Sequence, residues 1–188
     1  MKLLIKITIV LFAAAAILGC KEKTQRKTEE PGGKKMEIEV TSSAFEPNAM
    51  IPSKYTCDGL NISPPLKWEG VPQAAQSIAL ISDDPDAPAG TWVHWVMWNI
   101  PAATAELPEN VRPDKKIADG SVQGITDFQR HGYGGPCPPS GTHRYYFKVY
   151  ALDIKLDIPS SSTKKDLLKA MQGHILAEGQ IVGKYKRG

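Results

Sequence analysis

Short β-rich runs between proline- and glycine-rich breaks limit the folds open to this chain more than any other feature. The runs combine β-branched and aromatic residues with polar ones, and they span 36–41, 77–82, 92–100, 143–153 and 179–185. The 15 prolines and 16 glycines fall mostly outside these runs, where they favour turns and long loops. Short strands with such punctuation predict a mostly β protein built on an antiparallel sheet.

One segment, residues 163–178, has the pattern of an α-helix. Thr163 is followed three residues later by Asp166, which resembles a capping box, and Gly179 suits a helix end. Apolar residues recur between them at helical spacing, namely Leu168, Met171 and Ile175. We therefore predict one C-terminal helix, packed on an edge or end of the sheet.

The first twenty residues have the layout of an export signal. Lys2 and Lys6 precede an uncharged run that ends at Cys20, and the run is shorter than the roughly 20 residues of a membrane-spanning helix. Its last residues, AILGC, resemble a bacterial lipobox, in which the cysteine is acylated after cleavage. We predict a signal peptide at 1–19 and a lipid on Cys20, which would anchor the protein to a membrane of the bacterial cell envelope. An ordinary secretory leader with an incidental cysteine is the alternative.

Residues 20–35 continue from the lipidated cysteine into a predicted flexible tether, since they contain no large apolar side chain. Residues 1–35 hold eight of the 23 Lys and Arg but only three of the 20 Asp and Glu. This segment therefore has a formal charge of +5, which accounts for the overall +3, and residues 36–188 have a formal charge of −2. A folded part without a basic stripe argues against nucleic-acid binding. Its length is that of one domain, at 36–188.

Candidate binding residues concentrate first in residues 82–99. Asp84 and Asp86 flank a proline, which restricts the backbone and holds both carboxylates in place. If 92–100 is extended, His94 shares a face with three residues, Trp92, Val96 and Trp98. Apolar residues on both faces predict a central strand covered on both sides, where an imidazole needs a polar partner or a cavity.

The second concentration lies in residues 132–146. A glycine- and proline-rich loop leads into a β run in which His143 and Tyr145 point the same way. Two histidines, a phenol and backbone N–H groups could together hold a phosphate, sulfate or carboxylate. The aspartates of the first segment would orient the imidazoles and favour their charged form.

Structural roles remain open for each of these residues taken singly. Asp84 and Asp86 could cap backbone N–H groups of a turn, as Asp beside Pro often does. His94 and His143 could be core histidines with satisfied hydrogen bonds, and the tryptophans could be core residues of the sheet.

Four motifs together resemble the bacterial and archaeal branch of the phosphatidylethanolamine-binding proteins. They are YTCDGLNISPPLKW at 55–68, DPDAP at 84–88, WVHWVMWNIP at 92–101 and GYGGPCPPSGTHRYYFKVYALD at 132–153. The resemblance extends over essentially all of residues 36–188. It implies a Greek-key β-sandwich with a central antiparallel sheet, a ligand pocket at one end, and a cis peptide bond near 84–88 or 135–139.

The resemblance also implies a set of ligand-binding residues. They are Asp84, Asp86, Pro88, His94, Gly135, Pro136, His143 and Tyr145. Their expected partner is an anionic small molecule or a phospholipid head group, with no cofactor and no metal.

Cys57 and Cys137 remain when Cys20 is assigned to the lipid, and they make a candidate disulfide in an exported protein. Two small buried thiols are the alternative. Both cysteines lie in family motifs that flank the predicted pocket, so a bond between them would rigidify its rim.

The sequence thus predicts a membrane-tethered binding protein rather than an enzyme. No activated Ser or Cys beside a base is recognisable, and no HExxH-type metal spacing occurs. Two alternatives stay open: a hydrolytic enzyme that uses the Asp/His pocket, and an inhibitor whose partner is an envelope protease or hydrolase.

Overall fold

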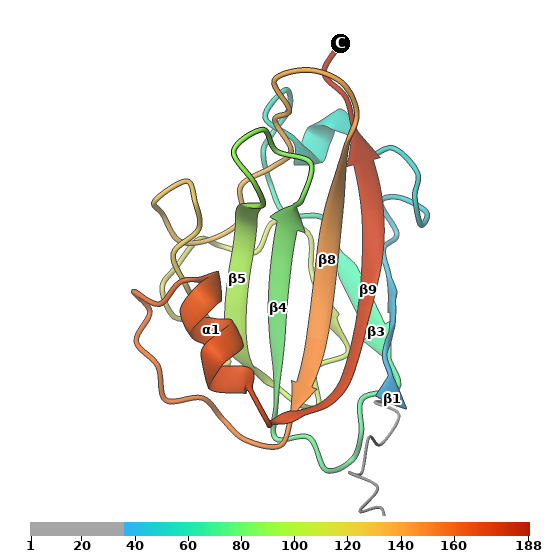
Figure 1. Ribbon diagram of the computed structural model, residues 1–188. Helices are drawn as coiled ribbons and strands as arrows, with labels where there is room; N and C mark the ends of the chain where they lie inside the picture. Colours follow the sequence, from blue (N-terminus) through green and yellow to red (C-terminus); the bar gives the residue numbers. More distant parts are fainter. Residues whose placement is uncertain (1–35) are drawn as a thin grey trace, which may run out of the picture. The chain divides into compact units, whose positions relative to one another are not determined.

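The computed structural model describes residues 36–188 (Figure 1). The predicted signal peptide, Cys20 and the tether lie outside the described residues. The elements are β1 (Met36–Glu37), β2 (Glu39–Thr41), a 3-10 turn η1 (Ser53–Tyr55), β3 (Leu66–Glu69), β4 (Ser77–Asp84), β5 (Trp92–Pro101), β6 (Glu106–Leu107), β7 (Val122–Gln123), β8 (His143–Leu152), α1 (Lys164–Met171) and β9 (Ile175–Tyr185). Within 36–188, no helix is long and apolar enough to cross a membrane.

Two sheets form the domain. The larger has the strand order β1-β9-β8-β4-β5-β7 and is antiparallel except for the β1–β9 pair, and the smaller is an antiparallel sheet with the order β2-β3-β6. The four long strands β4, β5, β8 and β9 correspond to four of the predicted runs. The predicted mostly β fold with antiparallel sheets and one helix is confirmed.

The predicted strand at 36–41 is divided between the two sheets. Ile38 N–H donates to the Glu178 carbonyl at 3.0 Å, and the chain then leaves the larger sheet and enters the smaller one. Gly179 permits this crossing, because a Cβ there would lie 1.7 Å from the Ile38 carbonyl oxygen. A pattern of alternating residues continues through such a crossing, so the sequence did not reveal it.

The helix prediction was wrong in length and in buried face. Helix α1 is eight residues long and ends at Met171, and Gly173 follows with φ of +82°. Ile175 begins β9, where it pairs with Leu152 of β8. The fully buried apolar residues of the helix are Leu167 and Met171, whereas 42% of Leu168 is exposed. Sheet pairing with β8 therefore overrode the helical spacing of the sequence.

The predicted start of the helix is confirmed. Thr163 stands at the N-cap, and its backbone N–H donates to Asp166 Oδ2 at 2.9 Å. The contact satisfies a backbone donor at a helix end that has no intrahelical partner.

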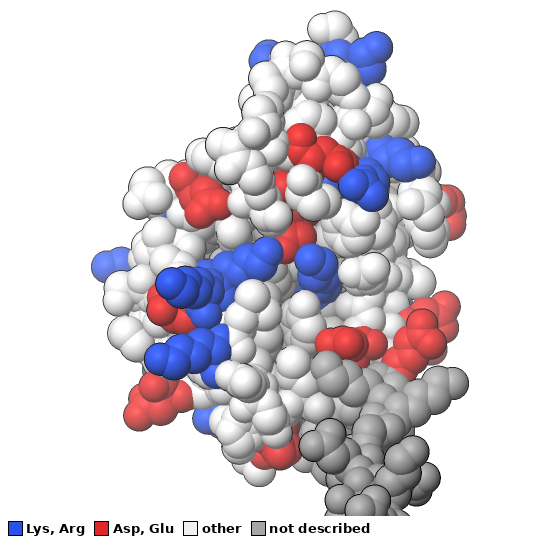
Figure 2. Space-filling model, viewed as in Figure 1, with Lys and Arg blue, Asp and Glu red and all other residues white. Residues whose placement is uncertain are grey.

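The two faces of the larger sheet carry separate parts of the core. The smaller sheet covers one face, and the residues buried there include Trp68, Trp95 and Phe147. Helix α1 lies over β5 on the other face, where Leu167 packs with Val96 and other residues (Figure 1). On this second face, Lys and Arg side chains gather over α1 and the adjacent strands (Figure 2).

Candidate functional site

A β-bulge in β5 brings His94 to the site. Ser82 of β4 pairs with Trp95, but the next residue of β4 pairs with Val93, so His94 is an extra residue in the ladder. Val93 consequently packs in the cluster beneath α1, and the His94 ring lies 5.2 Å from the Tyr145 ring on the opposite face. The strictly alternating strand predicted from the sequence placed His94 on the face of Val96 and Trp98, which is wrong.

The imidazole of His94 is fixed by Gly134. The ring Nδ1 lies 2.6 Å from the Gly134 carbonyl oxygen, and Gly134 N–H donates to the His94 carbonyl at 2.9 Å. A carbonyl only accepts, so Nδ1 carries the proton and Nε2 of the neutral ring is an acceptor. Burial lowers the pKa of His94. The aspartates nearby, Asp84 among them, favour the charged form as expected, but burial outweighs them at His94.

Asp84 orients the second histidine. Asp84 Oδ2 accepts a hydrogen bond from His143 Nδ1 at 2.7 Å, and both side chains are buried. Asp84 Oδ1 also accepts the backbone N–H of Asp86 at 2.8 Å. The carboxylate thus caps the turn after β4 and at the same time holds the imidazole, so both roles considered for it from the sequence are present.

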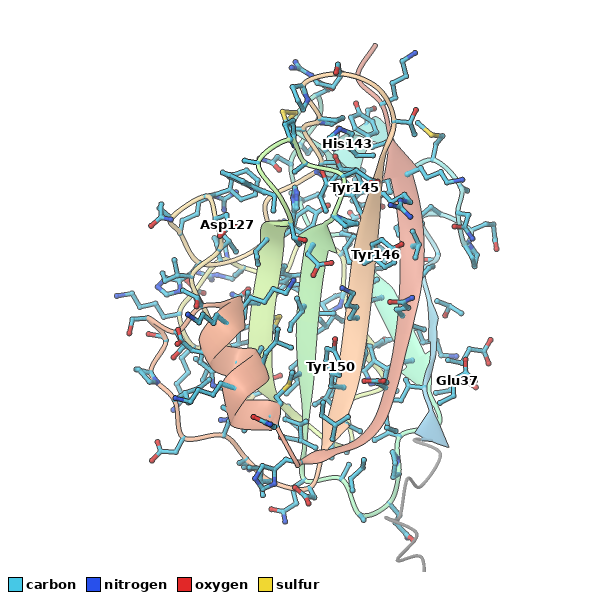
Figure 3. The ribbon with its side chains drawn as sticks, in the orientation of Figure 1. Glu37, Asp127, His143, Tyr145, Tyr146 and Tyr150 are labelled. Carbon is cyan, nitrogen blue, oxygen red and sulfur yellow. A yellow bond between two sulfur atoms is a disulfide. The ribbon has the colours of Figure 1, made fainter. Side chains whose placement is uncertain are left out.

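Tyr145 lies next to this pair, two residues along β8 from His143 (Figure 3). Its hydroxyl is buried and has no hydrogen-bond partner of good geometry among residues 36–188, although the Asp84 carboxylate is near. Burial, with the charge of Asp84, raises the pKa of Tyr145. The Asp84 carboxylate is therefore a close neighbour of this buried hydroxyl.

A cavity of about 240 Å³ opens at this end of the sheet. It is lined by Asp84, Ala87, Pro88, Trp92, His94, Phe128, Cys137, Pro138, Pro139 and His143. Four of the eight predicted ligand-binding residues are in this lining, two of them histidines from different strands. The convergence of acidic and imidazole groups from β4, β5 and β8 is the central geometric feature of the site.

The remaining predicted ligand residues have other contacts. The carboxylate of Asp86 binds the Arg144 guanidinium, with distances of 2.6 Å to Nη2 and 2.8 Å to Nε. The contact with Arg144 lowers the pKa of Asp86 to about 2. Gly135 N–H donates to Asn61 Oδ1 at 2.7 Å, and the Pro136 carbonyl accepts from Cys57 N–H at 3.1 Å. These three residues hold the rim, and neither they nor Tyr145 are among the residues that line the cavity.

Two aromatic rings, those of Trp92 and Phe128, form one wall of the cavity. Neither residue was given a role in the site from the sequence. The Phe128 ring centroid lies 5.3 Å from that of His94 and 5.6 Å from that of Trp92, both in edge-to-face geometry. Trp92 is 37% exposed, which is unusual for a large aromatic residue in a sheet. The one sequence signal for Phe128 was its position shortly before the Gly-rich loop.

The predicted disulfide joins Cys57 and Cys137, with Cα atoms 5.4 Å apart. It links the loop after η1 to the loop that carries Cys137, Pro138 and Pro139 in the cavity wall. The predicted cis peptide bond is absent from residues 36–188. In the same range, no group of three or more His, Cys, Asp or Glu side chains is arranged to hold a metal ion.

Comparison with protein families identifies the relatives of this chain. The family model described as phosphatidylethanolamine-binding protein matches residues 41–186. A UPF0098 protein of Methanothermobacter thermautotrophicus is 54% identical over 151 residues, which cover 80% of this chain and 100% of the relative. A UPF0098 protein of Aquifex aeolicus is 50% identical over 153 residues, with 80% and 89% covered.

Two crystal structures show the same similarity at the level of the fold. One is described as a putative phosphatidylethanolamine-binding protein homologue from Chlamydia trachomatis, with a TM-score of 0.75 and 41% identity. The other is Escherichia coli YbcL, described as a new member of the mammalian family, with a TM-score of 0.75 and 36% identity. Each comparison covers 81% of this chain and 99% of the other.

Proposed function

This chain belongs to the phosphatidylethanolamine-binding protein family, and on that premise we propose that its cavity binds the phosphate-type head group of a small molecule or phospholipid. One observation carries the proposal: a buried Asp84–His143 pair, 2.7 Å between Oδ2 and Nδ1, borders a cavity that two histidines line. With Nδ1–H directed at the carboxylate, a second proton on His143 would sit on Nε2 and make it a charged donor to an anion.

The size of the cavity favours a head group over a whole lipid. Its volume of about 240 Å³ is below the range of about 300–1,000 Å³ that is usual for drug-sized ligands. A phosphate group with a short substituent fits such a space, whereas an acyl chain would have to remain outside.

The polar groups of the cavity complement a phosphate monoester. His143 Nε2 would donate to a phosphate oxygen, and the acceptor Nε2 of neutral His94 suits a phosphate hydroxyl or an ammonium group. The exposed ring of Trp92 would favour a cationic substituent on the same molecule, whereas the Phe128 ring already has the Arg130 guanidinium 5.6 Å from its centroid. A zwitterionic head group such as phosphoethanolamine meets all of these conditions.

The N-terminal segment adds a membrane location to the proposal. A lipid on Cys20 and a tether of 15 further residues would hold the domain close to a membrane surface of the cell envelope. The Cys57–Cys137 disulfide is compatible with an exported protein. Membrane phospholipids and their soluble phosphate esters are then the natural sources of the ligand.

Calorimetric titration of the purified chain with phosphoethanolamine tests the proposal. We expect His143→Gln to lower the affinity at least about tenfold, because it removes the charged donor while keeping the size of the side chain. His174→Gln is the matched control, since His174 Nδ1 also pairs with an aspartate, Asp153, at 2.8 Å but does not line the cavity. Equal affinities of the two variants, or no binding by the wild-type chain, would contradict the proposal.

The same preparation distinguishes binding from catalysis. We expect phosphoethanolamine to be recovered intact after long incubation, because no Ser, Thr or free Cys lines the cavity and residues 36–188 hold no metal-binding cluster. Hydrolysis by the wild-type chain that is lost in His94→Gln would instead make the cavity an active site.

A further inference from the structure

The loop of residues 124–135 runs beside β5 and donates backbone hydrogen bonds to three of its carbonyl groups. Gly124 N–H donates to the Val96 carbonyl at 3.0 Å, Asp127 N–H to the Val93 carbonyl at 3.2 Å, and Gly134 N–H to the His94 carbonyl at 2.9 Å. Two of these contacts fall on the bulge itself. The loop follows β7 in the chain and continues its hydrogen bonding to β5 past the bulge.

Asp127 makes the charge-assisted contact of this set. Its Oδ2 accepts the backbone N–H of Val93 at 2.7 Å, so the residue binds both the N–H and the carbonyl of Val93. Val93 is directly before His94 and packs on the opposite face of the sheet. Fixing both backbone groups of Val93 determines the direction in which the chain enters His94.

Asp127 also determines where the next residue lies. Phe128 projects its ring between His94 and Trp92, at centroid distances of 5.3 and 5.6 Å. The other side of this ring lies against Gly134, where a Cβ would come within 2.3 Å of Phe128 Cε2. The His94 ring is thus enclosed by Phe128 and by the Gly134 carbonyl, both on the loop that Asp127 attaches to the bulge.

We infer that Asp127 is a positioning residue for His94: it holds the bulge and the Phe128 wall in the geometry that fixes the His94 ring in the cavity. Asp127 does not line the cavity and acts through Val93 and Phe128. The effect on ligand affinity rests on the proposed function of this cavity, whereas the effect on the orientation of His94 does not.

NMR of the His94 side chain tests this inference directly. In ¹⁵N-histidine-labelled wild-type chain, long-range correlations should show a single His94 tautomer with the proton on Nδ1, as the contact with the Gly134 carbonyl requires. We expect Asp127→Ala to release the ring, so that its nitrogen signals shift toward a mixture of tautomers. Phosphoethanolamine affinity should fall about tenfold, because the His94 ring would no longer be held in the orientation that binds the ligand.

Two comparison variants separate positioning from general loop stability. Asp127→Asn keeps an acceptor oxygen for Val93 N–H and should restore both the single tautomer and an affinity within about twofold of wild type. Asp119→Ala removes a loop aspartate of the same kind, whose Oδ1 accepts Ser121 N–H at 2.8 Å away from the cavity lining. It should change neither readout.

Each outcome decides the inference. An unchanged His94 spectrum in Asp127→Ala overturns it, even if the affinity falls. If Asp127→Ala does not fold, Asp127→Glu displaces the carboxylate by one methylene group, and the same change in the His94 spectrum is expected. Failure of the wild-type chain to bind phosphoethanolamine would contradict the proposed function but leave the spectral test of Asp127 intact.

Discussion

Asp83 and Asp84 are consecutive residues of β4, yet their carboxylates bind partners on opposite faces of the larger sheet. Asp83 accepts hydrogen bonds from Lys148 Nζ at 2.9 Å and from Nζ of Lys164, the first residue of α1. Asp84 accepts one from His143 at the cavity. Because side chains alternate along a strand, one of these two residues attaches the helix on one face of the sheet and the other belongs to the candidate site on the opposite face.

Replacing each aspartate by asparagine should affect a different property: stability for Asp83 and ligand affinity for Asp84. Asp83→Asn removes a buried acceptor of two ammonium groups, so the free energy of unfolding should fall by about 2 kcal/mol. Its phosphoethanolamine affinity should stay within about twofold of wild type, because Asp83 does not line the cavity. Asp84→Asn should lower the affinity at least about tenfold, since the carboxylate that accepts from His143 Nδ1 and orients the ring in the cavity is lost. Urea denaturation measures the free energy of unfolding, and calorimetry measures the affinity. Equal losses of affinity in the two variants would contradict the prediction.

The buried His94 should make stability depend on pH. Burial lowers its pKa below the ordinary value of 6.5, so between these two values the unfolded chain binds a proton that the folded chain does not. The contribution of His94 to the free energy of unfolding is fully present above about pH 6.5, and it is lost as the pH falls below that value. We expect His94→Gln to flatten this part of the curve of unfolding free energy against pH. The half-exposed His174 supplies the control, and His174→Gln should leave the His94 contribution in place.

Loss of the disulfide should destabilise the domain more than it disturbs the cavity. Cys57 and Cys137 are 80 residues apart, and closing a loop of that length constrains the unfolded chain by up to about 4 kcal/mol. The same two segments are also joined by Tyr133 Oη–H donating to the Tyr55 carbonyl at 2.9 Å. The Cys57→Ser/Cys137→Ser chain should therefore unfold at lower urea concentration but bind phosphoethanolamine within about threefold of wild type. Reductant should reproduce the loss of stability in wild type and have no effect on the double variant.

The long strands and part of the cavity lining could be predicted because their signals are local. Alternating β-rich residues mark β4, β5, β8 and β9, and the DPDAP and GTHRYY motifs place Asp84 and His143 at the ends of two of those strands. The orientation of His94 could not be predicted, because it depends on a bulge. A bulge changes the face of every residue beyond it, yet it is set by contacts with Asp127 and Gly134 some 30 to 40 positions away.

The roles of the backbone groups at the rim could not be predicted from the sequence either. Glycines 134 and 135 suggested exposed N–H donors for an anion, but both N–H groups are bonded, to the His94 carbonyl and to Asn61 Oδ1. Gly135 is required because a Cβ would lie 2.5 Å from the Tyr55 carbonyl oxygen. Close packing between distant loops therefore explains this glycine, and only the folded chain reveals which loops meet.

Two neighbouring leucines test the corrected position of helix α1. The sequence pattern assigned Leu168 to the buried face, whereas Leu167 is fully buried and Leu168 is 42% exposed. Leu167→Ala should lower the free energy of unfolding by about 3 kcal/mol, because it leaves a cavity between α1 and the sheet. Leu168→Ala should change it by less than about 0.5 kcal/mol, since alanine suits an exposed helix position. Urea denaturation of both variants measures the difference, and a larger loss for Leu168→Ala would place the helix in the register that the sequence first indicated.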